Sequence, residues 1–115
     1  MRPIMPFAAL GLALALASAV ATTAALADDT HIQISIKDHH FDPATPTVPA
    51  GQPVVIDVKN LDTTPAEFES KTLRVEKVVT GGGSISVRVR ALPPGRYRFF
   101  DDYHEATTVG FLVVK

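Results

Sequence analysis

Apolar residues alternate with polar ones along several short segments of this chain, and this period of two constrains the fold more than any other feature. In "HIQISI" (31–36) every second residue is isoleucine, and in "SISVRVR" (84–90) Ile85, Val87 and Val89 alternate with serines and arginines. Successive side chains of a β-strand point to opposite faces, so each segment presents one apolar face. A slip of one residue would expose that face, so the pattern also fixes strand register.

Three further segments are predicted to be strands: "VVIDVK" (54–59), the segment from about Arg96 to Phe100, and "VGFLVVK" (109–115). The segment 41–53 holds four prolines and a glycine, which predicts an extended edge and turn and not a ladder strand. Short strands with turn signals about every ten residues indicate an all-β sandwich of six or seven strands.

The segment "AEFESKTLRVEKVV" (66–79) fits two structures. Leu73 and Glu76 suit a short helical turn, whereas glutamates that alternate with Phe68 and Ser70 indicate a strand. The valines near its end and the three glycines that follow favour two strands joined by a loose hairpin.

The first 27 residues have the layout of a secretory signal peptide. Arg2 supplies a positive start, residues 4–20 form an apolar run, and Ala25-Leu26-Ala27 is a small-x-small cleavage pattern. We therefore expect cleavage after Ala27, export to the periplasm, and a single domain over residues 28–115. The alternative is a retained membrane anchor, although the run is rich in alanine and short for a span of about 20 residues.

Composition excludes several classes of protein. The chain has no cysteine, so it has no disulfide, no thiolate ligand and no lipid attachment of the lipoprotein type. Without Arg2, ten basic residues face twelve acidic ones, and this balance argues against nucleic-acid binding.

Histidines are the first candidates for a site. His39 and His40 follow the first predicted strand, and His104 lies in the loop before the last one. In a sandwich these two places can lie at the same end, which would bring one of the first pair near His104. Imidazole is a common ligand of copper, zinc and iron. The competing interpretation is that each is an ordinary surface histidine.

Acidic residues are the second candidates. Glu67 and Glu69 are two apart on a predicted strand and therefore share a face. That face is either a metal-binding one or an ordinary solvated one paired with nearby lysines. Asp101 and Asp102 are consecutive, so their side chains diverge and at most one faces a given metal ion. We expect Glu105 only to solvate the loop.

The segments "FDPATPTVPAGQPVVIDVKN" (41–60) and "LPPGRY" (92–97) resemble the cupredoxin-like domain over the whole mature chain. The resemblance implies a Greek-key β-sandwich. Blue-copper members of that superfamily bind copper through a histidine, a cysteine, a second histidine and usually a methionine. In this sequence Ala66 stands at the first position and Asp101 at the cysteine position, so blue-copper electron transfer is excluded.

A narrower resemblance rests on Glu67-Phe68-Glu69 and on Glu76 in the run that follows. It is to the cupredoxin components of bacterial periplasmic iron-uptake systems of the EfeO and FtrB type. This resemblance implies that the protein binds an iron or copper ion, and that it delivers iron to an inner-membrane iron permease or oxidises iron for it. It also implies other periplasmic iron-binding partners, and contact with the membrane only through a partner protein. It suggests Glu67, Asp101 and His40 as metal ligands. With Glu69 and His104 from the residue pattern, the predicted ligand set is His40, Glu67, Glu69, Asp101 and His104.

Two other functions remain open at this point. One is a metal-free interaction module that docks to a periplasmic or membrane partner, which Ala66 in the usual ligand position favours. The other is an enzyme such as a ferroxidase, because turnover and stoichiometric binding need the same open metal position.

Overall fold

The computed structural model describes residues 2–5, 11, 13–20 and 29–115. The expected cleavage site after Ala27 lies outside the described residues. No helix in the described part of the chain is long and apolar enough to cross a membrane. Residues 30–114 hold nine strands: β1 (Thr30–Lys37), β2 (His40–Asp42), β3 (Thr47–Val48), β4 (Val54–Asn60), β5 (Ala66–Ser70), β6 (Val75–Val79), β7 (Ser84–Val89), β8 (Gly95–Asp101) and β9 (Val109–Val114).

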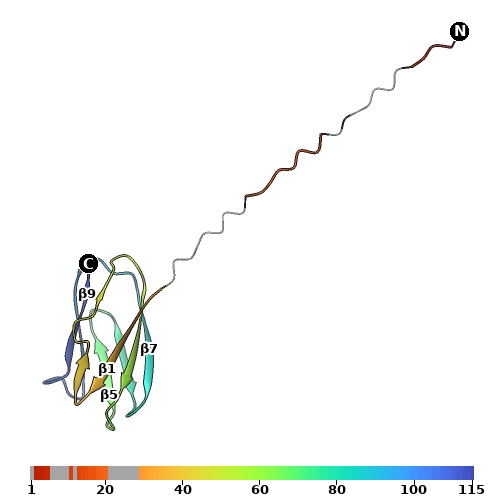
Figure 1. The fold of residues 1–115 in the computed structure, drawn as a ribbon. Coiled ribbons are helices and arrows are strands. Elements are labelled where there is room, and N and C mark those ends of the chain that lie inside the picture. The colour runs from red at the N-terminus through yellow and green to blue at the C-terminus, as the bar shows by residue number, and fades with distance from the viewer. Residues whose placement is uncertain (1, 6–10, 12, 21–28) are drawn as a thin grey trace.

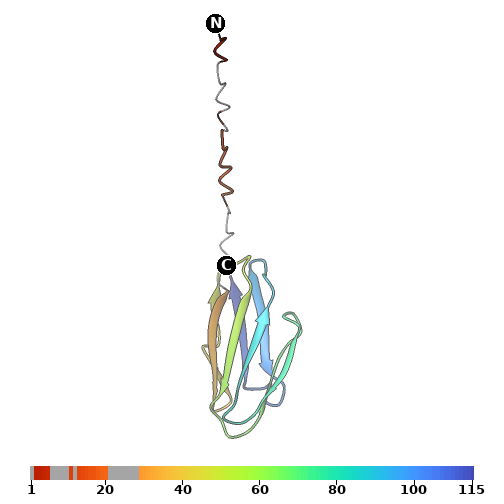
Figure 2. The same cartoon turned by 90° about the vertical axis from the view of Figure 1, so that its right-hand side faces the viewer.

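The strands form two sheets packed face to face (Figure 1, Figure 2). One sheet has four strands in the order β2-β1-β4-β7, and the other has five in the order β3-β9-β8-β5-β6. Strands β1 and β4 are parallel, as are β3 and β9, and the other pairs are antiparallel. The predicted all-β two-sheet sandwich is confirmed.

The core lies between the sheets and is built from the faces that the alternation predicts. Ile34, Ile56 and Val58 are fully buried on one side, and Phe68 and Phe99 on the other. Phe41 closes the aromatic cluster, with its ring centroid 4.9 Å from that of Phe99. The segment 66–79 forms the two strands β5 and β6, and a tight turn rather than a helix joins them.

The prediction that residues 41–53 form no ladder strand is wrong. His40–Asp42 pairs with β1 and Thr47–Val48 pairs with β9, which raises the number of strands to nine. Both short strands lie at sheet edges and contain no proline. The prolines lie between and after them, where no ladder hydrogen bond is needed.

Four connections meet at one end of the sandwich: residues 38–39, 61–65, 80–83 and 102–108. We call this the loop end. Asp62 accepts hydrogen bonds from the backbone N–H of Asp38 (2.7 Å) and of His39 (3.0 Å), which ties the first connection to the second. Gly81 packs so closely on the second connection that an added Cβ would clash with the carbonyl oxygen of Thr63.

Candidate metal centre

Three carboxylates converge on the outer face of the five-stranded sheet. Ala66, Phe68 and Ser70 of β5 point into the protein, so Glu67 and Glu69 emerge together on the other face, each half-buried. Asp102 joins them because its backbone N–H donates to the carbonyl of Glu67 (2.9 Å) just after β8 ends. One oxygen from each of Glu67, Glu69 and Asp102 lies within 4.8 Å of the others. We call these three residues the carboxylate cluster.

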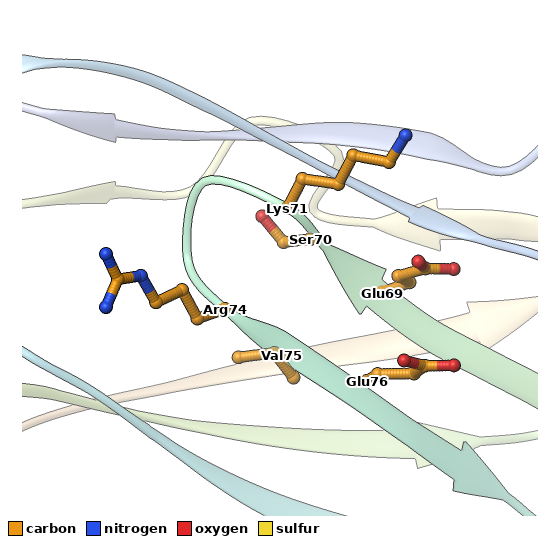
Figure 3. Close-up of a pocket in the computed structure, with 6 residues that line it drawn as sticks. All are labelled: Glu69, Ser70, Lys71, Arg74, Val75 and Glu76. Carbon is orange, nitrogen blue, oxygen red and sulfur yellow. The ribbon is translucent and has the colours of Figure 1, made fainter.

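A fourth acid borders the carboxylate cluster. Glu76 of β6 lies directly opposite Glu69 in the antiparallel pair. Figure 3 shows these two side chains next to each other, whereas Arg74 at the hairpin turn points away from them. A shallow cavity of about 270 Å³ is lined by these two glutamates and by Lys71 and Arg74. Like charges that face each other across a sheet destabilise it, so this pair has a cost that a bound cation would offset.

Burial and neighbouring charges raise the affinity of Glu67 and Glu69 for protons. Partial burial is the main cause that raises the pKa of Glu67, the contact with Glu76 and the charge of Asp102 raise it further, and a hydrogen bond with Tyr103 opposes them. Burial, followed by the charges of Asp102 and Glu76, raises the pKa of Glu69, against a smaller opposite effect of Lys71. Glu67 and Glu69 therefore hold protons more strongly than isolated carboxylates do, and the negative charges beside them also attract cations.

Asp101 has a different role in the structure. It is fully buried. Its Oδ1 accepts hydrogen bonds from the backbone N–H of Glu67 (2.9 Å) and of Tyr103 (3.0 Å), and its Oδ2 lies 2.9 Å from Nδ1 of His104. Both oxygens thus have partners within the protein. These hydrogen bonds let Asp101 fix the start of the last connection. The side chains of Asp101 and Asp102 diverge, so only Asp102 belongs to the carboxylate cluster.

The histidines form a separate group. The rings of His39 and His104 stack with centroids 3.9 Å apart, so His39, and not His40, is the one that approaches His104. Nδ1 of His39 lies 3.7 Å from Asp62. His40 is exposed on β2, where it pairs with Lys37, and its neighbour Phe41 points into the core. Of the five predicted ligands, the structure brings together Glu67 and Glu69 in one group and Asp101 and His104 in another.

The sequence prediction missed Asp102 as a member of the cluster and Tyr103 as a neighbour of Glu67. It named Glu76 only as part of the resemblance to the iron-uptake components, and not as a neighbour of Glu69. One signal would have found Glu76: in a hairpin whose turn is residues 71–74, the strand pairing places residue 76 opposite residue 69.

Comparison with known proteins identifies the family. Residues 7–114 match the family model of the Cupredoxin-like domain. The chain belongs to the cupredoxin-like family. Over 83 residues this cupredoxin-like chain is also 40% identical to uncharacterized protein RP394 of Rickettsia prowazekii (strain Madrid E). That match covers 72% of the chain, and the chain spans 66% of the length of this relative.

Solved structures support the same fold at low sequence identity. The metal-binding domain of the Cu(I)-exporting P-type ATPase CopA of Streptococcus pneumoniae D39 has a TM-score of 0.64 and 16% identity, covering 74% of this chain and 84% of that one. Auracyanin A, a "blue" copper protein of Chloroflexus aurantiacus, has a TM-score of 0.64 and 19% identity, covering 76% and 100%. At these identities the likeness shows the cupredoxin-like fold alone.

The residues of this cupredoxin-like domain do not fit a conventional blue-copper centre. Such a centre needs a cysteine thiolate, and the chain has none. Asp101, which stands at the expected thiolate position, has its oxygens engaged in hydrogen bonds, and Ala66 offers no ligand atom. The carboxylate cluster instead supplies only oxygen donors, a set that suits hard or borderline cations such as iron or manganese ions.

Proposed function

We propose that this cupredoxin-like chain is an exported metal-binding protein that takes part in ferrous iron uptake. The observation that carries the proposal is the meeting of Glu67 and Glu69 with Asp102 on one sheet face. The resemblance of the Glu67-Phe68-Glu69 step to the iron-uptake components of the EfeO and FtrB type supports iron as the cargo. Export with cleavage after Ala27 belongs to the proposal.

The side chains have separate tasks in this proposal. Glu67, Glu69 and Asp102 hold the ion through carboxylate oxygens, and Glu76 adds negative charge across the strand pair. Tyr103 lies beside Glu67, where its hydroxyl is placed to orient the carboxylate. An oxygen-rich site is a weak match for Cu(I), and it stabilises Fe(II) and, more strongly, the more highly charged Fe(III).

Release of the ion follows from proton competition. A carboxylate must be deprotonated to ligate, and the raised pKa values of Glu67 and Glu69 mean that protons compete at higher pH than they do for ordinary carboxylates. Affinity therefore falls as the pH drops towards these pKa values. An iron permease of the inner membrane and other periplasmic iron-binding components are the proposed receivers and donors.

Calorimetric titration of the chain that starts at Asp28 tests the proposal. We expect Fe(II), titrated without oxygen, to bind at one site, and the Glu67→Gln/Glu69→Gln variant to lose at least tenfold in affinity. Glu105→Gln is the matched control, because this exposed acid pairs with Arg98 (3.0 Å) outside the cluster and its loss should change little. His104→Ala tests whether the separate imidazole pair contributes.

The result that contradicts metal binding is an absence of heat with Fe(II), Cu(II) and Zn(II) alike. The competing function, a metal-free interaction module, would then hold. One observation favours that module: both oxygens of Asp101, the residue that the resemblance places at the thiolate position of blue-copper proteins, already have partners. Equal binding by the parent chain and the double glutamate variant would place the ion outside the carboxylate cluster.

A further inference from the structure

The charged side chains of residues 29–115 are divided unequally between the two ends of the sandwich. Strand β1 begins and strand β9 ends at the end opposite the loop end (Figure 1, Figure 2). We call it the basic end. Its exposed cationic residues are Arg88, Arg90, Arg96 and Lys115. Within residues 29–115, the acid at this end is Asp29, which is already paired with Arg88.

Strand register places these cations together. Thr30 pairs with Val54, and Val54 with Val89, so Arg90 extends just past the edge of the four-stranded sheet. In the other sheet Gly95 pairs with Val114, so Arg96 and Lys115 occupy the corresponding edge. The hairpin turn that carries Lys71 and Arg74 lies beside the middle of β8 and next to Glu69 and Glu76, so its cations are not counted with this end.

The loop end has the opposite charge. Its basic residues are Lys37, Lys59 and Lys77, the last of which pairs with Phe68 at the level of Asp101. The acids that the strand ends and connections place at the loop end are Asp38, Asp42, Asp62, Glu67, Asp101, Asp102 and Glu105. The formal net charge of −1 for the whole chain therefore hides a strong separation of charge along the strands.

The two ends are far enough apart to act independently in salt. Strands β4 and β8 have seven residues each. At about 3.3 Å per residue such a strand is roughly 23 Å long. The Debye length at physiological ionic strength is about 8 Å. A surface that faces the basic end thus interacts with its cations, while salt screens the acids of the loop end.

We propose that the basic end docks on an anionic lipid surface. The chain that precedes Thr30 joins the sandwich at this end, so the apolar run of residues 4–20 brings this end to the membrane before any cleavage after Ala27. The end that first follows this segment therefore carries the charge that anionic headgroups attract. The interaction is independent of the proposed metal site, and it replaces the expectation that the protein reaches the membrane only through a partner.

The arginine side chains are held in place to make such contacts. The guanidinium of Arg96 lies over the ring of Phe111, 4.6 Å from its centroid. That of Arg90 is fixed by its hydrogen bond to Thr72. Both residues remain exposed. Less side-chain entropy is lost when a cation that is already oriented meets a phosphate group, and arginine is well suited to bind phosphate.

Co-sedimentation with lipid vesicles tests the proposal. The chain that starts at Asp28 is suitable, because all nine strands and every residue of the core lie within it. We expect binding to vesicles of phosphatidylcholine mixed with phosphatidylglycerol, none to phosphatidylcholine alone, and release at high salt. Binding to neither kind of vesicle at low salt overturns the proposal.

A matched pair of variants locates the surface. Arg90→Gln/Arg96→Gln and Lys37→Gln/Lys59→Gln remove the same charge from opposite ends. Each cation near an anionic membrane contributes a factor of about five in affinity, so the first variant should bind about 25-fold more weakly. The second should bind as the parent chain does. Equal weakening in both variants would refute docking through the basic end.

Two checks keep the test decisive. Thermal unfolding must show that both variants remain folded; if the first does not, Arg88→Gln/Lys115→Gln replaces it, with the same expected loss. Light scattering without vesicles must show a monomer. A salt-sensitive assembly of copies, basic end to loop end, would overturn the proposal in favour of self-association.

Discussion

At the scale of single residues, the neighbours Asp101 and Asp102 show how the structure divides structural and functional tasks. Asp101 is buried and accepts three hydrogen bonds, whereas Asp102 is exposed and belongs to the carboxylate cluster. The sequence predicts that consecutive side chains diverge, but it does not predict which one enters the protein. That choice depends on the backbone N–H groups that the last connection presents, and these exist only in the folded chain.

Substitution of these two aspartates separates the tasks. Asp101→Ala leaves two backbone donors and an imidazole without their acceptor, so we expect it to lower the free energy of unfolding by about 1–3 kcal/mol or more. Asp102→Asn should stay within about 0.5 kcal/mol of the parent chain. Urea unfolding of the metal-free protein measures both. A neutral Asp101→Ala would show that its hydrogen bonds do not hold the loop.

The carboxylate cluster predicts an unusual dependence of stability on pH. Because the folded state raises the pKa of Glu69, chiefly through burial, ionisation of this residue costs the folded state more than the unfolded one. Stability is therefore lost as the pH rises from the ordinary carboxyl range through the raised value. Glu69→Gln should melt higher than the parent chain at pH 7, and the difference should vanish below about pH 4. A variant that melts lower at pH 7 without metal would contradict this electrostatic account.

At the scale of elements, the connections at the loop end are held by a few polar side chains. Asp62 of the segment between β4 and β5 accepts from the N–H groups of Asp38 and His39 in the β1–β2 turn. Those two residues have positive φ values of 50° and 59°, which turn the chain so tightly that His39 faces His104 and His40 enters β2. The sequence left open which of the two histidines would approach His104, because this turn conformation is not visible in a pattern of residue types.

Removal of Asp62 should loosen this end in a pH-dependent way. The hydrogen bond from the backbone N–H of His39 is the main cause that lowers the pKa of Asp62. The ionised Asp62 therefore stabilises the fold above its ordinary pKa of 3.8, and this stabilisation is lost as the pH falls below that value. At pH 7 we expect Asp62→Ala to cost about 1–3 kcal/mol. Chemical denaturation at pH 7 and at acid pH measures the difference. An equal cost at both pH values would exclude the carboxylate as the cause.

At the scale of the whole molecule, the alternation of apolar residues predicts the two-layer sandwich and most of its strands. It misses β2 and β3, because two or three paired residues next to prolines carry no periodic signal. The shared face of Glu67 and Glu69 also follows from the period of two. Their meeting with Asp102 and Glu76 does not, because it depends on pairing between strands that are distant in the sequence or joined by a turn of unknown register.

The central claim is that the carboxylate cluster binds a metal cation, and a crystal soaked with Mn(II), an oxygen-preferring substitute for Fe(II), tests it most directly. The account predicts an anomalous diffraction peak between Glu67, Glu69 and Asp102, with Glu76 beside it, and no such peak in Glu67→Gln/Glu69→Gln. A peak only at the stacked pair His39 and His104, or no peak at all, would contradict it.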